Sequence, residues 1–421
     1  MENIELDRRD FLKGAVAGAV LLLTADALEA AEAEKAEQKP IPGPPVALGV
    51  IGLGTWGRQL VTTLSKMPSA KVAGLCDVYE PYLERAQKLV PGAIASTDYR
   101  KLLDSKDIEA VIVATPSHLH KQIALDSIAA GKHVYCEAPL AITVEEAREI
   151  AVAGKNSKNV FQVGLQGRSN SLYRHVEKFV LSGCLGKPAQ AYAQSNKRQQ
   201  GRRMAPDPER EKELNWRLYR ATSAGLVGEQ GVHAIDLANW YLRALPTSAV
   251  GFGAIMCWDD GRDTPDTVQC ILEYPNSVRM VYLATTVSSF SSEYSLFQGS
   301  QSSLLLRENK GWMVKEADSP LLGWEVYARK ETCFDETGIC MIADATKILS
   351  QGKEPGKEGS TTPEKEPLYL ALENFTRSIR ENSPPVCGAV EGYQAAVCAI
   401  KANEAILTGN KVTFQKEWFD V

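Results

Sequence analysis

Apolar and polar positions between residues 46 and 166 follow two alternating patterns. Short apolar runs of strand length are separated by stretches in which apolar residues recur at helical spacing. We expect strands at 46–51, 71–76, 110–114, 132–136 and 159–164. We expect helices at 56–67, 80–90, 98–104, 118–130 and 143–156, with Gly131 and Gly154 as stop signals. Strands that alternate with helices in this way predict a parallel sheet covered on both faces.

The pattern changes after residue 166 and predicts a second domain. From about 247 to 315, strand-length runs such as 268–274 and 278–285 follow one another and are separated by turn residues. This pattern is typical of a largely antiparallel sheet. Helical patterns at 367–381 and 389–407 close the chain. The predicted fold is therefore an α/β domain followed by an α+β domain with a large, mainly antiparallel sheet.

The first 45 residues and one later stretch have no place in these two sheets. Arg8 and Arg9 precede Phe11 and an apolar stretch that is too short to remain in a bilayer as an anchor, as in twin-arginine export signals. We expect residues 1–33 to be a signal peptide and the mature protein to be periplasmic or otherwise extracytoplasmic. Residues 34–45 are expected to form a linker or arm, and the polar residues 351–366 to be mobile. We expect no permanent membrane anchor.

Composition and charge narrow the choice of partners. The net charge is -5, and no segment interleaves Lys and Arg with aromatic residues, so we expect no nucleic acid partner. The basic run at 197–203 is expected to be a solvated loop. Cys333 and Cys340 are close enough in sequence to form a disulfide, and no spacing of Cys and His suits a metal site. Other cysteines lie in apolar runs and are expected to be buried free thiols: Cys76, Cys136 and Cys270.

A glycine-rich turn follows the strand at 46–51. Gly52 permits the tight turn, Gly54 allows a pyrophosphate to approach the backbone, and Gly57 allows the next helix to pack closely. Thr55 and Trp56 open that helix, whose unpaired amides and partial positive charge suit phosphate groups. The turn therefore predicts a dinucleotide site.

Asp77 ends the second predicted strand, twenty-five positions after Gly52. Its carboxylate is placed to accept hydrogen bonds from the adenosine ribose and to repel a 2′-phosphate, and no Arg follows it immediately. We therefore expect NAD as the cofactor, with NADP disfavoured.

Two segments follow later strands of the same predicted sheet. Because ligands bind outside the carboxyl ends of parallel strands, we expect both segments to line the nicotinamide half of the cleft. The candidate cofactor-binding residues in them are Thr115, Pro116, His118, Glu137 and Ala138. His120 is expected to bond a loop backbone instead.

Glu229, His233, Asp236 and Trp240 fall on one face if residues 228–240 form a single helix. An imidazole with a pKa near 6.5 suits the removal of a hydroxyl proton, so His233 is the catalytic candidate; the alternative is a histidine bonded to Glu229 for structure. Asp236 is a candidate substrate contact, and Trp240 is expected to be mainly packing.

Further candidates lie between the two domains. Gln166 and Arg168 follow the strand at 159–164, where a salt bridge at the domain junction is one interpretation of these residues. Trp216 and Arg217 could stack on and hydrogen-bond a sugar ring, or Trp216 could be packed in the interior.

The order of these motifs resembles that of the Gfo/Idh/MocA oxidoreductases over nearly the whole chain after residue 45. The resemblance implies a Rossmann NAD-binding domain at 46–166 and a substrate and oligomerisation domain at 167–421. It also implies a carbohydrate substrate, meaning a sugar, a cyclitol or a derivative of these, and homo-oligomers formed through the open sheet. Glu229 and His233 match the acidic and histidine positions that contact substrate in the family. Gln166 and Arg168 match a family segment near cofactor and substrate, so the resemblance makes Gln166 a candidate cofactor contact and Arg168 a candidate substrate contact.

The sequence departs from the family at one catalytic position. The usual Glu-Lys-Pro reads Glu137-Ala138-Pro139, and a methyl group cannot donate a proton. The NAD-dependent glycosidases that resemble this family also have an apolar residue there. Three hypotheses follow: a sugar oxidoreductase that recycles tightly bound NAD, a redox-neutral glycosidase, lyase or epimerase that works through a transient keto-sugar, and a nucleotide-binding protein without catalysis.

Overall fold

The structure is a computed structural model that describes residues 40–307, 310–321, 325, 328–341 and 366–421. The predicted signal peptide at 1–33 and the arm residues 34–39 lie outside the described residues, as do residues 351–365 of the segment predicted to be mobile. Among the helices in the described residues, none combines the length and the apolar character needed to cross a membrane.

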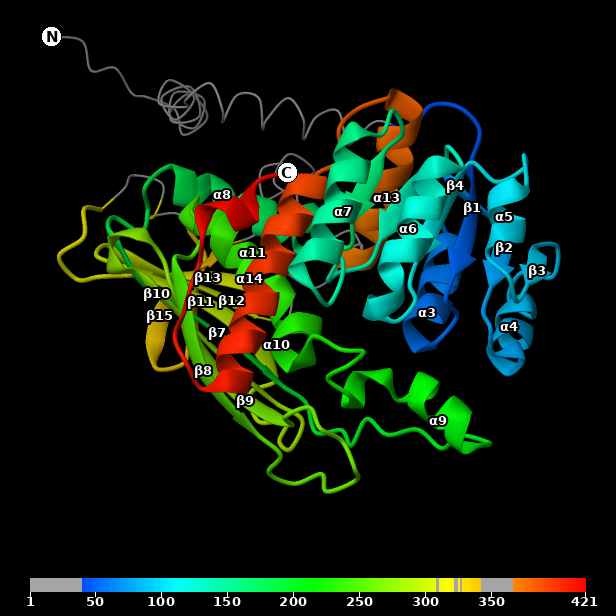
Figure 1. Ribbon diagram of the computed structural model, residues 1–421. Coiled ribbons are helices and arrows are strands. Elements are labelled where there is room, and N and C mark those ends of the chain that lie inside the picture. The colour runs from blue at the N-terminus through cyan, green and yellow to red at the C-terminus, as the bar shows by residue number, and fades with distance from the viewer. Residues whose placement is uncertain (1–39, 308–309, 322–324, 326–327, 342–365) are drawn as a thin grey trace, which may run out of the picture.

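The first domain contains a six-stranded parallel sheet with the strand order β3-β2-β1-β4-β5-β6 (Figure 1). Its strands are β1 (Val46–Ile51), β2 (Ala70–Cys76), β3 (Ile94–Ser96), β4 (Ala110–Val113), β5 (His133–Cys136) and β6 (Phe161–Val163). The connecting helices are α3 (Thr55–Leu64), α4 (Glu80–Gln87), α5 (Arg100–Asp104), α6 (His120–Ala129) and α7 (Val144–Asn156). The expected parallel sheet is confirmed, and β3 is an additional strand.

The two glycines expected to end helices behave differently. Gly131 follows α6 with φ +71°, a left-handed conformation that suits a helix end. Gly154 lies inside α7, so its assignment as a stop signal is wrong. A Cβ atom on Gly154 would lie 2.7 Å from the ring of Phe161, so this glycine lets the helix approach β6.

The second domain contains a ten-stranded sheet in which every pair is antiparallel except β7 and β10. Its strands are β7 (Pro188–Asn196), β8 (Ser248–Ala254), β9 (Thr267–Glu273), β10 (Arg279–Thr285), β11 (Glu293–Gly299), β12 (Ser302–Arg307), β13 (Lys310–Lys315), β14 (Lys330–Cys333), β15 (Glu336–Met341) and β16 (Val412–Thr413). Three helices pack on one face: α8 (Ser171–Leu181), α11 (Gly231–Leu242) and α14 (Ala389–Thr408). The mainly antiparallel sheet is confirmed.

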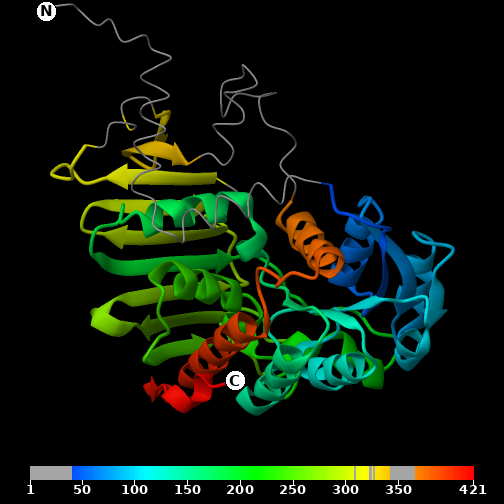
Figure 2. The ribbon, with the colours of Figure 1, turned by 90° about the horizontal axis from the view of Figure 1, so that it is seen from above.

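Helix α13 (Pro367–Glu381) returns to the first domain, as Figure 2 shows. Leu368, Leu372 and Phe375 are buried in one cluster with β1 and α3, and the Phe375 ring meets Tyr135 of β5 at 5.6 Å. A single boundary after residue 166 therefore does not describe α13, which covers the parallel sheet although it follows the second domain in sequence.

All nine cysteines are free thiols, so the possible bridge between Cys333 and Cys340 is not present. Cys333 on β14 is paired in register with Glu336, which places Cys340 four positions further along β15. The expected burial of Cys76, Cys136 and Cys270 is confirmed.

Candidate active site

The glycine-rich turn connects β1 to α3 at the carboxyl end of the parallel sheet. Gly52 has φ +95°, and a Cβ atom there would lie 2.5 Å from the carbonyl oxygen of Ala114. A Cβ atom on Gly57 would lie 1.9 Å from the carbonyl oxygen of Gly52, whereas one on Gly54 would meet no atom within 4 Å. Gly52 and Gly57 are thus required by close backbone packing, and Gly54 leaves open space above the turn.

This open space fits a dinucleotide. Thr55 and Trp56 are the first residues of α3, so their amide groups have no partners within the helix. The hydroxyl oxygen of Thr115, which follows β4, is buried with no hydrogen-bond partner among the described residues. The free amides at the start of α3 are suitable donors to the phosphates of NAD, and the buried hydroxyl of Thr115 is left without a partner of its own within the part of the chain that the structure describes.

Asp77 is held in place by the turn itself. Its Oδ2 accepts a hydrogen bond from the Leu53 amide at 2.6 Å, and its Oδ1 accepts one from the Tyr79 amide at 2.8 Å. Burial raises the pKa of Asp77, and the two amide hydrogen bonds and the charge of Arg210 oppose that rise. Each carboxylate oxygen retains a free lone pair with which it could accept a hydrogen bond from a ribose hydroxyl.

Two histidines join the segments that follow β4 and β5. His120 is buried, with Nδ1 2.9 Å from the carbonyl oxygen of Pro139 and Nε2 2.9 Å from that of Thr115. The expectation that His120 bonds a loop backbone is met. His118 follows Pro116 in a short 3-10 helix, and its Nδ1 lies 3.1 Å from the carbonyl oxygen of Thr222 in the second domain.

Glu137 lies buried beside the glycine-rich turn. Its Oε1 accepts a hydrogen bond of 2.7 Å from the indole nitrogen of Trp56, and burial raises the pKa of Glu137 to about 7. A Cβ atom on Gly164 would lie 2.3 Å from Glu137 Oε2, so the carboxyl group is packed against the backbone after β6. Ala138 packs against the apolar interior, and Gln166 is half-buried at the start of the 3-10 helix Gln166–Ser169.

The predicted single helix over residues 228–240 is wrong, because two helices meet at Gln230. Glu229 ends α10 (Gly225–Glu229), and α11 begins at Gly231. The side chain of Gln230 accepts a hydrogen bond from Ser195 of β7 at 3.1 Å, and a Cβ atom on Gly231 would lie 2.9 Å from the Tyr282 ring. These contacts with the large sheet turn the chain at Gln230, so Glu229 does not continue the helical row of His233 and Asp236.

Glu229 connects the two domains. Its Oε2 accepts a hydrogen bond from Ser117 of the first domain at 3.0 Å, and its Oε1 accepts others from Ser223 at 3.3 Å and from the Ala224 amide at 3.2 Å. Burial raises the pKa of Glu229, and Arg217 with these hydrogen bonds opposes the rise. The role of Ser117 was missed in the sequence, because no local pattern indicates a contact across 112 residues.

His233 lies in the first turn of α11, four residues after Glu229 and beyond the break at Gln230. Its side chain is exposed, and among the described residues no hydrogen bond to it is present, so the alternative of a structural bond to Glu229 is not realised. The protein around the ring reduces its hydration, and this desolvation lowers the pKa of His233 to about 4. The imidazole is therefore neutral near pH 7, and its free nitrogen is available to a substrate proton.

Arg168 and Asp236 bind each other. The guanidinium donates three hydrogen bonds of 2.9 to 3.1 Å to the Asp236 carboxylate and lies 5.5 Å from the centre of the Trp240 ring. Their side chains are 15% and 4% exposed, respectively. This geometry corresponds to the domain-junction alternative more closely than to two side chains that await a substrate.

Trp216 is buried, and its ring face is covered by the guanidinium of Arg217 at 4.1 Å. The Arg217 side chain is 57% exposed, and its Nε lies 3.9 Å from Glu229 Oε2. Arg217, and not the indole of Trp216, is therefore the group presented to a ligand.

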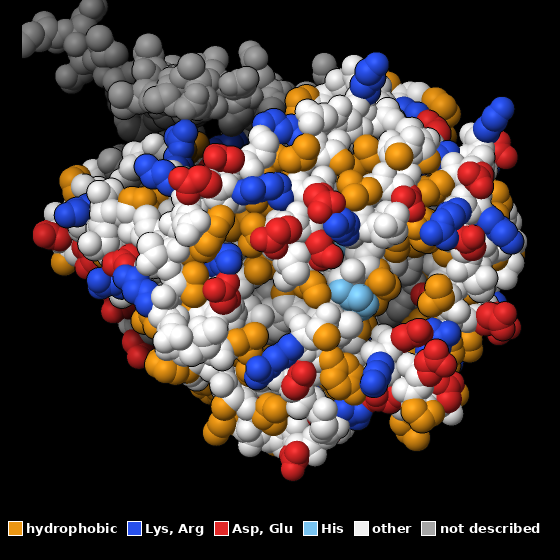
Figure 3. Space-filling view, in the orientation of Figure 1, with side chains coloured by type: hydrophobic (Ala, Val, Ile, Leu, Met, Phe, Trp, Pro, Cys, Tyr) orange, Lys and Arg blue, Asp and Glu red, His pale blue; other side chains and the backbone are white. Residues whose placement is uncertain are grey.

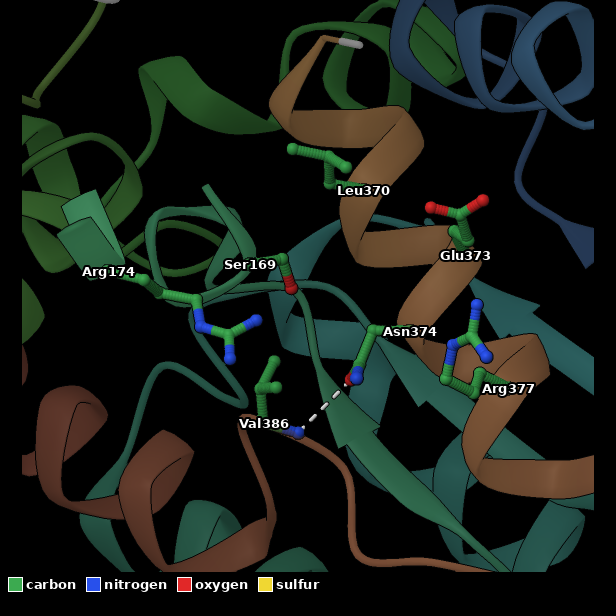
Figure 4. A pocket seen from close by; sticks show the side chains of 7 residues that line it. All are labelled: Ser169, Arg174, Leu370, Glu373, Asn374, Arg377 and Val386. Atoms are coloured by element: carbon green, nitrogen blue, oxygen red, sulfur yellow. Dashed lines mark hydrogen bonds between the residues drawn. The ribbon is translucent and has the colours of Figure 1, made fainter. Parts of the chain in front are cut away.

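A separate small pocket lies between α13 and the 3-10 helix that contains Arg168 (Figure 4). Asn374 accepts a hydrogen bond from the Val386 amide at 3.1 Å, and Ser169 lines the same pocket. None of the candidate site residues lines this pocket. On the face drawn in Figure 3 acidic and basic side chains are interspersed, so no field of one sign dominates that face.

Comparisons with known proteins agree with this arrangement. The family described as "Oxidoreductase family, NAD-binding Rossmann fold" (GFO_IDH_MocA) matches residues 46–165, and the GFO/IDH/MocA C-terminal domain matches residues 173–304. An uncharacterized oxidoreductase of Streptococcus pneumoniae is 24% identical over 87% of this chain and 95% of its own length. An alpha-N-acetylgalactosaminidase of Shewanella oneidensis is 33% identical over 38% of this chain and 39% of its own length.

Solved structures share the fold. Levoglucosan dehydrogenase in complex with NADH and L-sorbose superposes with a TM-score of 0.71 at 19% identity, covering 88% of this chain and 99% of that one. The two-domain architecture is thus the same in both proteins.

Proposed function

Because the chain belongs to the Gfo/Idh/MocA family of NAD-binding oxidoreductases, we propose that it oxidises a sugar, a cyclitol or a sugar derivative with NAD that stays bound between turnovers. The observation that carries the proposal is His233, an exposed imidazole without a hydrogen-bond partner in the described part of the chain, four residues after Glu229. Glu229 bonds Ser117 beside the cofactor turn, so α11 begins close to the carboxyl ends of the parallel strands.

Each residue of the site has a separate role in the proposed reaction. NAD supplies the hydride acceptor when it is bound. His233 takes the proton of the substrate hydroxyl, since its lowered pKa keeps the ring unprotonated at neutral pH and leaves a nitrogen lone pair available. Trp56 fixes the carboxyl group of Glu137 beside the turn, and Arg217 presents hydrogen-bond donors to hydroxyl groups of the substrate.

Retention of the cofactor follows from the proposed location. The twin-arginine pattern at Arg8 and Arg9 supports export, and the twin-arginine route carries folded proteins, so NAD can be bound before the protein leaves the cytoplasm. Outside the cytoplasm free dinucleotide is scarce, and an enzyme that recycles its bound NAD does not need a supply. Asp77 favours NAD over NADP for the reason given above.

A redox-neutral reaction is the second candidate, and Ala138 is the observation that favours it. The methyl group of Ala138 cannot donate a proton, and the relative from Shewanella is named as a glycosidase. In this reaction the hydride returns to the same sugar after elimination or epimerisation. The same site, His233 included, serves either reaction.

The exposed face of the large sheet supports a homo-oligomer. Ile271, Val281, Tyr192 and Leu296 are neighbours in register across β9, β10, β7 and β11, and they point away from the helices. Ile271 is 38% exposed and the nearby Phe252 is 66% exposed. A continuous apolar row on an open sheet is expected to be covered by a second copy of the chain. Light scattering of the purified protein would show a dimer or larger assembly, and a monomer would contradict it.

The experiment that tests the proposed function uses the purified protein with its bound cofactor. A panel of sugars, cyclitols and glycosides is added while absorbance and fluorescence of NADH are recorded. We expect at least one carbohydrate to reduce the bound NAD, and a protein that binds no NAD or responds to no carbohydrate would contradict the proposal. His233→Ala is the matched control, because it should retain NAD and lose the response.

A further inference from the structure

Residues 197–215, which we call the strap, leave the large sheet after β7 and run beneath the first domain, where Figure 1 shows α9 (Pro208–Leu214) near α3 and α4. The start of the strap is fixed to the sheet domain, since the amides of Lys197 and Gln199 donate to the carbonyl oxygens of Thr285 and Thr286 at 3.0 and 2.9 Å. The basic run at 197–203 was expected to be a solvated loop. Residues 197–201 are exposed, whereas Arg202 and Arg203 are half-buried and have partners, which corrects the expectation for these two residues.

Arg203 reaches across to the cofactor turn. Its guanidinium donates to the hydroxyl of Thr55, the first residue of α3, at 3.3 Å and to the hydroxyl of Tyr82 at 3.2 Å. Its backbone is held by Asn215, which accepts from the Arg203 amide at 2.6 Å and donates to the Arg203 carbonyl oxygen at 3.0 Å. Asn215 is 2% exposed, so the strap presents Arg203 from a fixed position.

A second contact lies on the adenosine side of the turn. The Arg210 guanidinium stacks on the ring of Tyr79 at 5.0 Å. The Tyr79 amide donates a hydrogen bond to Asp77, the residue expected to bind the adenosine ribose. The Tyr79 and Tyr82 rings meet edge to face at 4.9 Å. The strap therefore contacts the first domain on both sides of the expected cofactor position.

The charge of Arg203 lacks an acidic partner. The neighbouring Arg202 pairs with Glu211 and Asp260, and Arg210 pairs with Glu213. Among the residues that the structure describes, the Arg203 guanidinium contacts only the neutral hydroxyls of Thr55 and Tyr82. A half-buried cation beside the N-terminus of α3 and the open cradle at Gly54 suits a doubly charged pyrophosphate.

We propose that Arg203 is a cofactor-binding residue that clamps the pyrophosphate of NAD from the second domain, and that the strap must open before the cofactor can leave. The inference rests on the proposed function, because it takes NAD as the occupant of the turn. The strap would thereby slow the release of NAD, as a cofactor that is recycled within the site requires.

The test measures binding and release of the cofactor and not turnover. Release of NADH from the full-length protein is followed by fluorescence for the wild type, Arg203→Gln and the matched control Arg198→Gln. Arg198 lies in the same strap but stacks on Trp258 and donates to the Val287 carbonyl oxygen, away from the turn. We expect the dissociation rate of NADH to rise about tenfold or more in Arg203→Gln, as for a lost hydrogen bond to a charged group, and to stay unchanged in Arg198→Gln.

Two further ligands separate a pyrophosphate clamp from a structural strap. ADP-ribose carries the pyrophosphate and adenosine does not, so Arg203→Gln should weaken only the binding of ADP-ribose. Equal NADH release in Arg203→Gln and the wild type, or an equal loss for adenosine and ADP-ribose, would overturn the proposal. If Arg203→Gln does not fold, Arg203→Lys, which keeps the charge and loses the planar fork, allows the same comparison. Failure of the proposed function would appear separately, as a wild type that binds NADH but responds to no carbohydrate.

Discussion

The pair of Arg168 and Asp236 gives a prediction that distinguishes a structural junction from a substrate contact. The Asp236 carboxylate accepts three hydrogen bonds of 2.9 to 3.1 Å from Arg168. Asp236→Asn removes the negative charge, so the Arg168 side chain, which is 15% exposed, loses its counter-ion. Breaking a buried ion pair in this way costs about 3–5 kcal/mol. Because the Trp240 ring still faces the guanidinium, we expect the lower end, about 3 kcal/mol.

Thermal and urea unfolding of the purified variants measures this cost. For a domain of this size, about 3 kcal/mol corresponds to a fall of roughly 6–12 °C in the unfolding temperature. Asp98→Asn is the control, because its pair with Arg100 is exposed on both sides and should be worth less than about 1 kcal/mol. The double variant Arg168→Met with Asp236→Leu, which leaves no unpaired charge, should be more stable than Asp236→Asn. If Asp236→Asn unfolds like the wild type and only turnover falls, the pair belongs to the substrate site and the structural interpretation is wrong.

Three further predictions concern the cofactor turn and the proposed base. His233→Ala should lower turnover by about a hundredfold or more with bound NAD retained, and wild-type rates would show that His233 is not the base. Gly57→Ala should lower the unfolding temperature even without NAD, because its Cβ would lie 1.9 Å from a backbone oxygen, whereas Gly54→Ala should weaken NAD binding in titrations without that loss. The raised pKa of Glu137, about 7, means that the unfolded state ionises first as pH rises, so the wild type loses stability between its ordinary pKa of about 4.5 and 7. Glu137→Gln should therefore be stabilised relative to the wild type more at pH 8 than at pH 4.5 in thermal unfolding, and an equal difference at both pH values would contradict the shift.

Most of the fold could be predicted because its signals are local. The strands β1, β4 and β5 are short apolar runs bounded by turns and helices. This pattern is typical of a strand that is buried on both faces of a parallel sheet. The strand β3 was not predicted, because three residues are too few to show a periodic pattern and its Ile94 is exposed.

The site was harder to predict from the sequence than the fold, because its geometry depends on contacts between distant segments. Helical spacing placed Glu229 and His233 on one face, but contacts of Gln230 and Gly231 with the large sheet divide the helix between them. A salt bridge of Arg168 at the domain junction was one alternative, but its partner Asp236 was not identified, since ion pairing between distant residues has no local signal. The hydrogen bond from Arg203 to Thr55 could not be predicted, because a basic run is typical of a solvated loop.

The fate of the hydride tests the central claim most directly. If NAD remains bound, each oxidation must be followed by a reduction in the same site, so NADH cannot accumulate in solution. A responsive carbohydrate deuterated at the oxidised carbon should pass its label to a second sugar, or back to its own product if the reaction is redox-neutral. Mass spectrometry of the products and of free NADH locates the label. Steady reduction of added NAD, with deuterium in the free NADH, would contradict the retained cofactor.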